Sequence, residues 1–494
     1  MQWAYLLGLV AAATAGHVSI PFSRQDYSAT AALVKRQASN GITLEALNNL
    51  TGGGYYSEFS IGTPPQKISF LLDTGSSDTW VNSVDVDLCN NKQAQARIGA
   101  FCQTQFNQNE SSTYQLVSSD GFDIKYLDST EISGDYFNDT VHIGSVSINN
   151  QQLGLALQSV RPTGIMGLGL SANVASRNKY NTIMDNLVAQ GFIGRAAFSL
   201  YLNDLESDSG TILFGAIDQK KFIGNLTVLP LASQTVGGQV TSFNVKLLGF
   251  DLLNPDGQNI LDLSNLNTNT VLDSGSTISL LPDKQVQQIW KQFGVVSIKG
   301  ILSPFVDCAY RGSRGEGYVF EFRFNGKTIQ VPMHEMVIDA YADMQEAFQS
   351  PSLSKYFSSW DSVCIFGIAS TANFNVPSGF TLLGASFLRS AYVVYDLTNE
   401  QLAIGQANLN STDSDIVEIK SGIAVPSVTG VASQTSNALP TRTSSATQTT
   451  STSSTQSTAG SAPDNNNASS RTLSPPPLAA IAALLCLGVA PFAL

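Results

Sequence analysis

Two short segments that each place an aspartate before a glycine turn carry the strongest chemical signal in the chain. They are Asp73–Ser77 (DTGSS) and Asp273–Thr277 (DSGST), and each follows an apolar run. Two apolar strands that end in this way and face each other form a carboxylate pair. Such a pair holds one proton between its members, because like charges about 3 Å apart cannot both ionise. One acid can then take a proton from water while the other donates one to a carbonyl, which is the chemistry of peptide hydrolysis without a covalent intermediate.

Each aspartate segment has a later echo in which two apolar residues precede a glycine. The echoes are Gly164–Leu168 (GIMGL) in the first half and Thr381–Ala385 (TLLGA) in the second. A segment of this kind can pass close behind a catalytic loop, since Gly permits close backbone approach. Two unrelated strand-and-turn signals are the alternative, but that reading does not account for the duplication.

These segments resemble those of the pepsin-like aspartic proteases, and the resemblance covers about Tyr55 to Ala407. It also includes Trp80, the opening YSEFSIGTPPQ at 56–66 and the closing FLRSAYVVYD at 387–396. The two ends of the chain narrow the resemblance to the fungal yapsin-like group anchored by glycosylphosphatidylinositol (GPI). The resemblance implies an aspartic endopeptidase that acts on peptides or proteins with Asp73 and Asp273 as catalytic residues. No cofactor is expected.

The residues that follow each aspartate are expected to support it. One hydroxyl in each loop can tie the two loops together, a second can donate to a carboxylate oxygen, and a glycine lets the loops approach; ordinary turn chemistry is the alternative. These residues are Thr74, Ser274, Ser76, Ser276, Gly75 and Gly275.

The resemblance also implies a hairpin flap at 124–129 in which Tyr126 is the flap tyrosine, hydrogen-bonded to Trp80. Leu127 and Ser129 replace two glycines that are usual at the flap tip. The resemblance further implies that Asp128 accepts a basic side chain before the scissile bond, where a charge-assisted hydrogen bond would contribute about 1.5–3 kcal/mol. A turn-forming Asp128 with no ligand role is the alternative.

Short alternating segments broken by Gly, Asn, Asp and Ser predict an all-β protein. With one aspartate segment in each half, the pattern predicts the bilobal pepsin-like fold with an active-site cleft between its lobes. The N-terminal β-lobe is expected at 37–228 and the C-terminal β-lobe at 229–414. Few helices are expected, and the best candidates are 182–190 and 284–293.

The N-terminus has the pattern of a secretory precursor. Residues 1–15 are expected to be a signal peptide with a small-x-small cleavage site at its end, and 16–36 a pro-segment. Lys35–Arg36 offers a dibasic site for a kexin-type processing enzyme, which would start the mature chain near Gln37. A solvated charge pair is the alternative for this dipeptide.

The C-terminus is expected to hold the protein at the cell surface. Residues 415–467 are expected to be a Ser/Thr-rich stalk, because the composition from Ser427 to Ser470 leaves too little apolar surface to fold; an O-glycosylated stalk and a plain linker are the two readings. Residues 468–494 are expected to be a propeptide that a GPI anchor at Asn467 replaces, on the cell membrane outer face or the cell wall. The uncharged end at 478–494 leaves a tail-anchored helix as the alternative.

Cysteines and glycosylation sequons fit an oxidising, secretory compartment. Setting aside Cys486 in the propeptide, four of the five cysteines remain and allow three pairings. The resemblance implies the pairs Cys89–Cys102 and Cys308–Cys364. Six Asn-x-Ser/Thr sequons indicate exposed sites for N-glycosylation; they are Asn49, Asn109, Asn138, Asn225, Asn410 and Asn467.

Charge and composition exclude several other classes. The net charge of −12 argues against nucleic acid as a partner, and no cysteine or histidine spacing indicates a metal site. His142 and His334 lie in no nucleophile pattern, so a Ser-His-Asp hydrolase is disfavoured. An inactive binding protein of the same fold and a glycosidase with a carboxylate pair remain as rivals. A monomer is expected.

Overall fold

The computed structural model describes most of the region in which the sequence predicts two lobes. The described residues are 16–24, 54–98, 102, 104–207, 209–233, 238–263, 266–299, 301–342, 345–350, 353–374, 376–377, 379–422 and 424–432. The predicted signal peptide, the dibasic site at Lys35–Arg36, the sequon at Asn49, and the GPI site and sequon at Asn467 lie outside these residues. Those expectations therefore remain predictions.

The described residues form five β-sheets, which agrees with the all-β prediction. The largest has thirteen strands in the order β12-β26-β25-β9-β10-β1-β2-β3-β8-β4-β7-β6-β5. Its strands are β1 (Val18–Arg24), β2 (Tyr55–Ile61), β3 (Gln66–Asp73), β4 (Trp80–Asn82), β5 (Gln115–Lys125), β6 (Glu131–Ile143), β7 (Val146–Gln158), β8 (Gly164–Gly167), β9 (Ala197–Tyr201), β10 (Ser209–Phe214), β12 (Phe222–Pro230), β25 (Ala391–Asp396) and β26 (Gln401–Ala407).

The smaller sheets belong mainly to the second half of the chain. A five-stranded sheet contains β13 (Asn244–Leu247), β16 (Thr268–Leu272), β24 (Thr381–Leu383), β17 (Ser279–Leu281) and β23 (Ile368–Ser370). A four-stranded sheet contains β15 (Asn259–Asp262), β14 (Gly249–Leu253), β19 (Val319–Phe324) and β20 (Lys327–Pro332). The others contain β18 (Phe305–Asp307), β22 (Val363–Phe366) and β21 (Val337–Ile338), and the pair β11 (Ala216–Asp218) with β27 (Ile416–Glu418).

Helices are short and few, as the sequence predicted. They are α2 (Asp87–Asn90), α3 (Lys92–Ile98), α4 (Ile183–Ala189), α5 (Asp283–Phe293), α6 (Gln345–Phe348), α7 (Ser354–Phe357) and α8 (Ala385–Leu388). Helices α4 and α5 coincide with the two expected helices. A capping box of Thr182 and Asp185 starts α4, and Gly294 in the left-handed conformation ends α5. Within the described residues, none of the helices has the length and apolarity needed to cross a bilayer.

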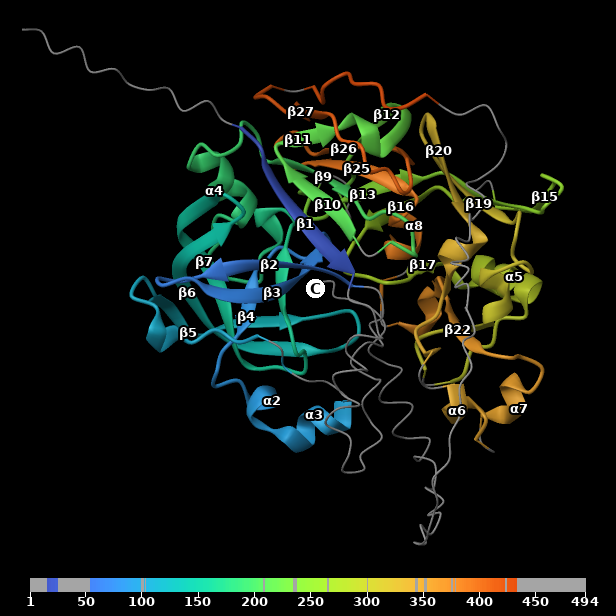
Figure 1. The fold of residues 1–494 in the computed structure, drawn as a ribbon, viewed down its shortest axis with the longest axis horizontal. Helices are drawn as coiled ribbons and strands as arrows, with labels where there is room; N and C mark the ends of the chain where they lie inside the picture. The colour runs from blue at the N-terminus through green and yellow to red at the C-terminus, as the bar shows by residue number, and fades with distance from the viewer. Residues whose placement is uncertain are drawn as a thin grey trace, which may run out of the picture.

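The two expected lobes share one β-sheet, so no single residue divides one lobe from the other. Figure 1 shows β2 to β7 on one side of the molecule, α5 to α7 and β22 on the other, and β9, β12, β25 and β26 between and above them. Strands β25 and β26, from the expected C-terminal lobe, pair with β9 and β12 of the expected N-terminal lobe. The expected boundary at 229 therefore falls inside β12, because no local pattern reports that strands 170 or more positions apart belong to one sheet.

A strand of the expected pro-segment is part of this shared sheet. Strand β1 pairs with β10 along six residues and touches the start of β2. Val18 and Ile20 of β1 are buried in the main apolar core. Release of residues 16–36 would therefore leave β10 and β2 without their common neighbour.

The packed chain extends past residue 415, where composition predicted an unfolded stalk. Strand β27 pairs with β11, and Ile419 is fully buried. Further along, the carbonyl oxygen of Gly422 accepts a hydrogen bond of 2.6 Å from the buried side chain of Arg195. The expectation of a stalk from 415 is corrected for residues 415–422 and 424–432. The composition argument applied to residues from Ser427 onward, whereas the short apolar segment from Ile416 to Ile419, which pairs with β11 and buries Ile419, lies before them.

Candidate active site

Each of the two aspartates, Asp73 and Asp273, lies at the end of a buried strand that pairs with its own echo segment. The last six residues of β3, ending in Asp73, are buried, and β16 leads directly into Asp273. Strand β3 pairs in parallel with β8, and β16 pairs in parallel with β24. The backbone N–H of Asp273 donates to the carbonyl of Leu383 at 3.0 Å, so the echo segment fixes the position of the aspartate.

Glycine is required where each echo passes behind its loop. A Cβ atom on Gly167 would lie 2.5 Å from the backbone carbon of Ser77, and one on Gly384 would lie 2.5 Å from the carbonyl oxygen of Ile278. Both neighbours are backbone atoms that cannot move aside. The two glycines of the echo segments therefore permit the close approach for which the sequence singled them out.

Four hydrogen bonds between the loops hold the two aspartates face to face. The Thr74 hydroxyl donates to the Leu272 carbonyl at 2.9 Å and accepts from the Ser274 backbone N–H at 2.9 Å. In the mirror arrangement, the Ser274 hydroxyl donates to the Leu72 carbonyl at 2.9 Å and accepts from the Thr74 N–H at 3.1 Å. Because all four groups are buried, the geometry of the pair is tied to the backbone of both lobes.

The carboxyl groups receive matching donors. The Gly75 N–H donates to Asp73 Oδ1 at 2.8 Å, and the Ser76 hydroxyl donates to Asp73 Oδ2. A Cβ atom on Gly75 would lie 2.6 Å from Asp273 Oδ1, so glycine makes room for the opposite carboxyl. The second loop repeats this pattern on Asp273 through the N–H of Gly275 at 2.9 Å and the hydroxyl of Ser276 at 2.6 Å.

The environment favours a pair that keeps one proton. Both side chains are fully buried and hydrogen-bonded to each other. Burial raises the pKa of Asp73 well above its usual value, and the negative charge of Asp273 raises it further. Burial also raises the pKa of Asp273, although hydrogen bonds from Ser276, Asp73 and Gly275 oppose the rise. The two groups titrate as one unit, and the shared proton persists to less acidic pH than in isolated carboxyls.

The predicted flap is a hairpin between β5 and β6, and Tyr126 directly follows the end of β5. The Trp80 Nε1–H donates to the Tyr126 hydroxyl at 2.7 Å. Burial raises the pKa of Tyr126 well above its usual value; the charge of Arg161 opposes the rise and that of Asp73 adds to it. Both charges therefore lie within electrostatic reach of this ring.

The two residues that replace flap glycines have different consequences. Leu127 is 4% exposed and packs with an apolar cluster of the second half that includes Val271 and Tyr341. Ser129 adopts a φ of 66°, the left-handed region that glycine occupies without strain. The flap tip is thus held against the opposite lobe by a side chain that glycine would lack.

Asp128 is not free to meet a substrate, which corrects its expected role. Its Oδ2 atom lies 2.6 Å from Nη2 of Arg161, and its side chain has no exposed surface. Its Oδ1 atom accepts from the backbone N–H of Thr130 at 2.9 Å and from the Thr130 hydroxyl at 2.6 Å. Sequence reasoning missed Arg161, because a lone arginine between Val160 and Pro162 gives no local signal.

Asp78 is a second residue that the sequence did not single out. It follows the first catalytic loop directly and is fully buried. It accepts hydrogen bonds from the hydroxyls of Tyr136 at 2.8 Å and Tyr180 at 2.7 Å, and from the backbone N–H of Ala175 at 2.7 Å. Burial raises the pKa of Asp78. Asp78 thus binds residues of three separate segments, and the only sign of this in the sequence is its position directly after the Asp73 loop.

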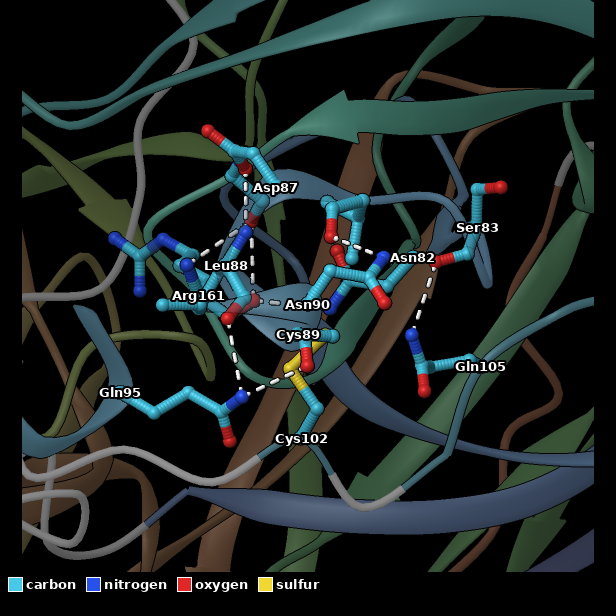
Figure 2. The surroundings of a disulfide bond; sticks show 12 residues. Asn82, Ser83, Asp87, Leu88, Cys89, Asn90, Gln95, Cys102, Gln105 and Arg161 are labelled. Atoms are coloured by element: carbon cyan, nitrogen blue, oxygen red, sulfur yellow. Dashed lines mark hydrogen bonds between the residues drawn. A yellow bond between two sulfur atoms is a disulfide. The ribbon is translucent and has the colours of Figure 1, made fainter. Parts of the chain in front are cut away.

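Two disulfides join the cysteine pairs that the resemblance implied, Cys89–Cys102 and Cys308–Cys364. The first fastens α2, and Figure 2 shows Asp87, Asn82 and Arg161 around it. The Asp87 carboxylate accepts from the N–H of Ser159 at 2.9 Å, which ties α2 to the segment that carries Arg161. Of the sequons, Asn109, Asn225 and Asn410 are exposed and Asn138 is half-buried in β6.

A buried charge cluster, composed of Asp204, His334, Glu335 and Arg389, joins the lobes away from the aspartate pair. Glu335 and Arg389 are ion-paired, and their side chains are almost completely buried. Glu335 Oε1 also accepts from the N–H of Leu205 at 3.0 Å. The Nε2 atom of His334 lies 3.4 Å from carboxylate oxygens of both Asp204 and Glu335.

The cluster is the better candidate of two groups of potential metal ligands in the described residues. Donor atoms of Asp204, His334 and Glu335 lie within 4.8 Å of one another. Arg389 already neutralises Glu335, however, so a metal cation would face a guanidinium group at close range. The second group contains Cys308 and Cys364, whose sulfurs are joined in a disulfide. Neither arrangement favours a metal centre over its existing bonds.

The charge cluster predicts a loss of stability at alkaline pH. Hydrogen bonds and the charges of Glu335 and Asp204 raise the pKa of His334 to about 9, against the opposing effect of burial. A raised pKa means that the stabilisation is complete below the usual value of 6.5 and disappears as pH rises through about 9. We expect the unfolding temperature to fall across this window and His334→Gln to reduce that fall. His142→Gln is the control, since the His142 ring lies against Ser147 and the Gly62 carbonyl. An unchanged pH profile for His334→Gln would contradict the prediction.

Comparison with known proteins agrees with this geometry. Residues 54–407 match a family described as eukaryotic aspartyl protease. The chain is 34% identical over 416 residues to "Probable aspartic-type endopeptidase opsB" of Aspergillus fumigatus, covering 81% of this chain and 77% of the relative. It is 33% identical to "Acid protease" of Saccharomycopsis fibuligera, covering 75% and 85%. It is 31% identical to "Secreted aspartic protease 3" of Candida albicans, covering 77% and 85%.

Proposed function

Because this chain belongs to the eukaryotic aspartyl protease family and is an aspartic-type endopeptidase, we propose that Asp73 and Asp273 perform its chemistry by activating water. The observation that carries this proposal is the shared hydrogen bond between two fully buried carboxyls, each supplied with one backbone and one hydroxyl donor. A pair with one proton contains both a base and an acid, which is what the addition of water to a peptide carbonyl requires.

The proposed reaction proceeds without a covalent intermediate. The ionised member of the pair takes a proton as water attacks the scissile carbonyl, and the protonated member donates a hydrogen bond to the carbonyl oxygen. The two carboxyls exchange roles when the tetrahedral diol collapses and the amine leaves with a proton. Thr74 and Ser274 act as positioning residues, since their hydrogen bonds run between the loops rather than to the carboxyls.

The experiment that tests this function is hydrolysis of a peptide substrate across acidic to neutral pH, with and without pepstatin. Pepstatin-sensitive hydrolysis with an acidic optimum is the expected result. An inactive binding protein would bind pepstatin without cleaving the peptide. A glycosidase would cleave an oligosaccharide and leave the peptide intact, so the three readings give different outcomes.

We further propose a secreted, surface-anchored monomer. The supporting observations are the apolar signal at 1–15, the dibasic Lys35–Arg36 for a kexin-type enzyme, two disulfides and exposed sequons. A relative of this chain is named as a secreted aspartic protease. The proposed anchor is a GPI group at Asn467, with residues 468–494 removed and a stalk that begins beyond the packed residues.

Truncation after Gly460 provides the test of the anchor. This change removes Asn467 and the apolar end, so we expect active enzyme in the culture medium instead of on the cell. The native protein should be released from cells by a phosphatidylinositol-specific phospholipase, and the truncated protein needs no such treatment. A truncated protein that stays with the membrane fraction, or a native one that the phospholipase leaves in place, would reject the GPI anchor.

The expected preference for a basic residue before the scissile bond is not carried into this proposal. It required a carboxylate at the flap that a substrate can reach. Asp128 has no exposed surface and already binds Arg161. Any selection for the charge of the substrate must therefore depend on something other than a free carboxylate at Asp128.

A further inference from the structure

The carboxylate of Asp128 is fully used by its own protein chain. Oδ1 accepts two hydrogen bonds from Thr130 and Oδ2 accepts one from Arg161, whose Nη2 atom also lies 3.1 Å from the Thr130 hydroxyl. The two side chains of the ion pair are 0% and 9% exposed. A substrate cation could bind Asp128 only by displacing Arg161, and that would leave a buried guanidinium group without its partner.

Arg161 is positioned by contacts that do not involve Asp128. Its guanidinium lies over the ring of Tyr126, with Cζ 4.9 Å from the ring centroid. Its carbonyl oxygen accepts from the Asn82 side chain at 2.9 Å and from the Ser159 hydroxyl at 3.0 Å. The guanidinium of Arg161 is therefore held at the base of the flap, over the ring of Tyr126, whose hydroxyl accepts a hydrogen bond from Trp80.

Asp128 lies two residues after Tyr126 in the flap, so its ion pair with Arg161 adjoins the ring whose hydroxyl binds Trp80. Arg161 lies over the Tyr126 ring, and the charges of Arg161 and Asp73 act on the pKa of Tyr126 in opposite directions. Loss of the guanidinium would leave a carboxylate beside this ring with one oxygen atom free to accept a hydrogen bond. A carboxylate in a partly dry environment attracts an ammonium or guanidinium group strongly.

We propose that Arg161 takes the place beside Asp128 that a substrate cation would otherwise occupy and thereby sets the charge preference of the enzyme. The wild-type protein does not favour Lys or Arg before the scissile bond, and removal of the Arg161 guanidinium creates that preference. This inference rests on the proposed peptidase function of the Asp73–Asp273 pair. It identifies Arg161 as a specificity-determining residue and explains how Asp128 can be present without basic selectivity.

The test compares two peptides that differ only in the residue before the scissile bond, which is lysine in one and norleucine in the other. The measured quantity is the ratio of kcat/KM for lysine to that for norleucine, because effects common to both substrates cancel. We expect a ratio below one for the wild-type protein and an increase of about tenfold or more for Arg161→Gln. Adding Asp128→Asn to that variant should return the ratio to near its wild-type value.

Arg177→Gln is the matched control, since Arg177 is an exposed arginine of the same lobe. It should leave the ratio unchanged. If Arg161→Gln does not fold, as judged by thermal unfolding, Arg161→Met keeps the apolar stem over Tyr126 and is used in its place. A wild-type ratio above ten would overturn the inference without any variant. So would a folded Arg161 variant that loses both activities equally, which is the result of a purely structural role.

These outcomes are distinguishable from failure of the proposed function itself. If the wild-type protein cleaves neither peptide under any condition, the peptidase proposal fails. If it cleaves the norleucine peptide and the ratio does not respond to Arg161, only the role of Arg161 fails.

Discussion

Asp73→Asn and Asp273→Asn should each lower the peptidase kcat by at least about a hundredfold while the protein remains folded. Loss of a general acid or base costs about 10²–10⁴-fold, and here either change leaves a single carboxyl where two must share a proton. An amide has nearly the same shape as the carboxyl and can still accept from Gly75 or Gly275. It cannot take a proton from water, so chemistry fails while the hydrogen-bonded loops persist.

Stability measurements make this prediction sharper. Burial raises the pKa of both aspartates, so the ionised forms are disfavoured in the folded protein and the penalty grows as pH rises through the raised pKa. At neutral pH we therefore expect the asparagine variants to unfold at the wild-type temperature or above it. Asp256→Asn makes the same chemical change in an exposed turn and should retain full activity. Turnover of more than a few per cent in either active-site variant would contradict the shared-proton mechanism.

Arg389→Met should strongly destabilise the protein although it lies outside the two aspartate loops. It removes the guanidinium that neutralises Glu335, whose side chain has no exposed surface. Removing one partner of a buried ion pair costs about 3–5 kcal/mol, because the remaining charge keeps its desolvation penalty. The cost is measured as the free energy of unfolding in urea at pH 6, where Glu335 of the wild-type protein is ionised because Arg389 and His334 lower its pKa against the effect of burial.

Two comparison variants separate charge burial from loss of packing. Arg314→Met removes an arginine that is 56% exposed and paired with Asp307, and it should cost no more than about 1 kcal/mol. Adding Glu335→Gln to Arg389→Met should recover part of the lost stability, since the buried charge is then absent. If the double variant has a lower free energy of unfolding than Arg389→Met, then removing the charge of Glu335 brings no gain. In that case the cost of Arg389→Met does not come from an unpaired buried charge.

The two aspartate loops and the chemistry proposed for them could be predicted from the sequence because each part of the signal is local. The Asp73 and Asp273 loops follow apolar strands, and a strand followed by an acid and a Gly turn constrains its own backbone. Duplication with an echo segment in each half then indicated that the two loops meet. The same locality explains why α4 and α5 were predicted, since capping residues and apolar spacing lie within the helices.

Only the tertiary structure decided which charges neutralise one another and where the lobes join. Arg161 reaches Asp128 from 33 positions away, and Arg389 reaches Glu335 from 54. Neither arginine lies in a sequence pattern that indicates which carboxylate it will pair with. Alternation and caps report which face of an element is buried, but an ion pair depends on how separate elements pack. The flap sequence alone therefore predicted an available carboxylate, whereas the fold supplied that carboxylate with a cation of its own.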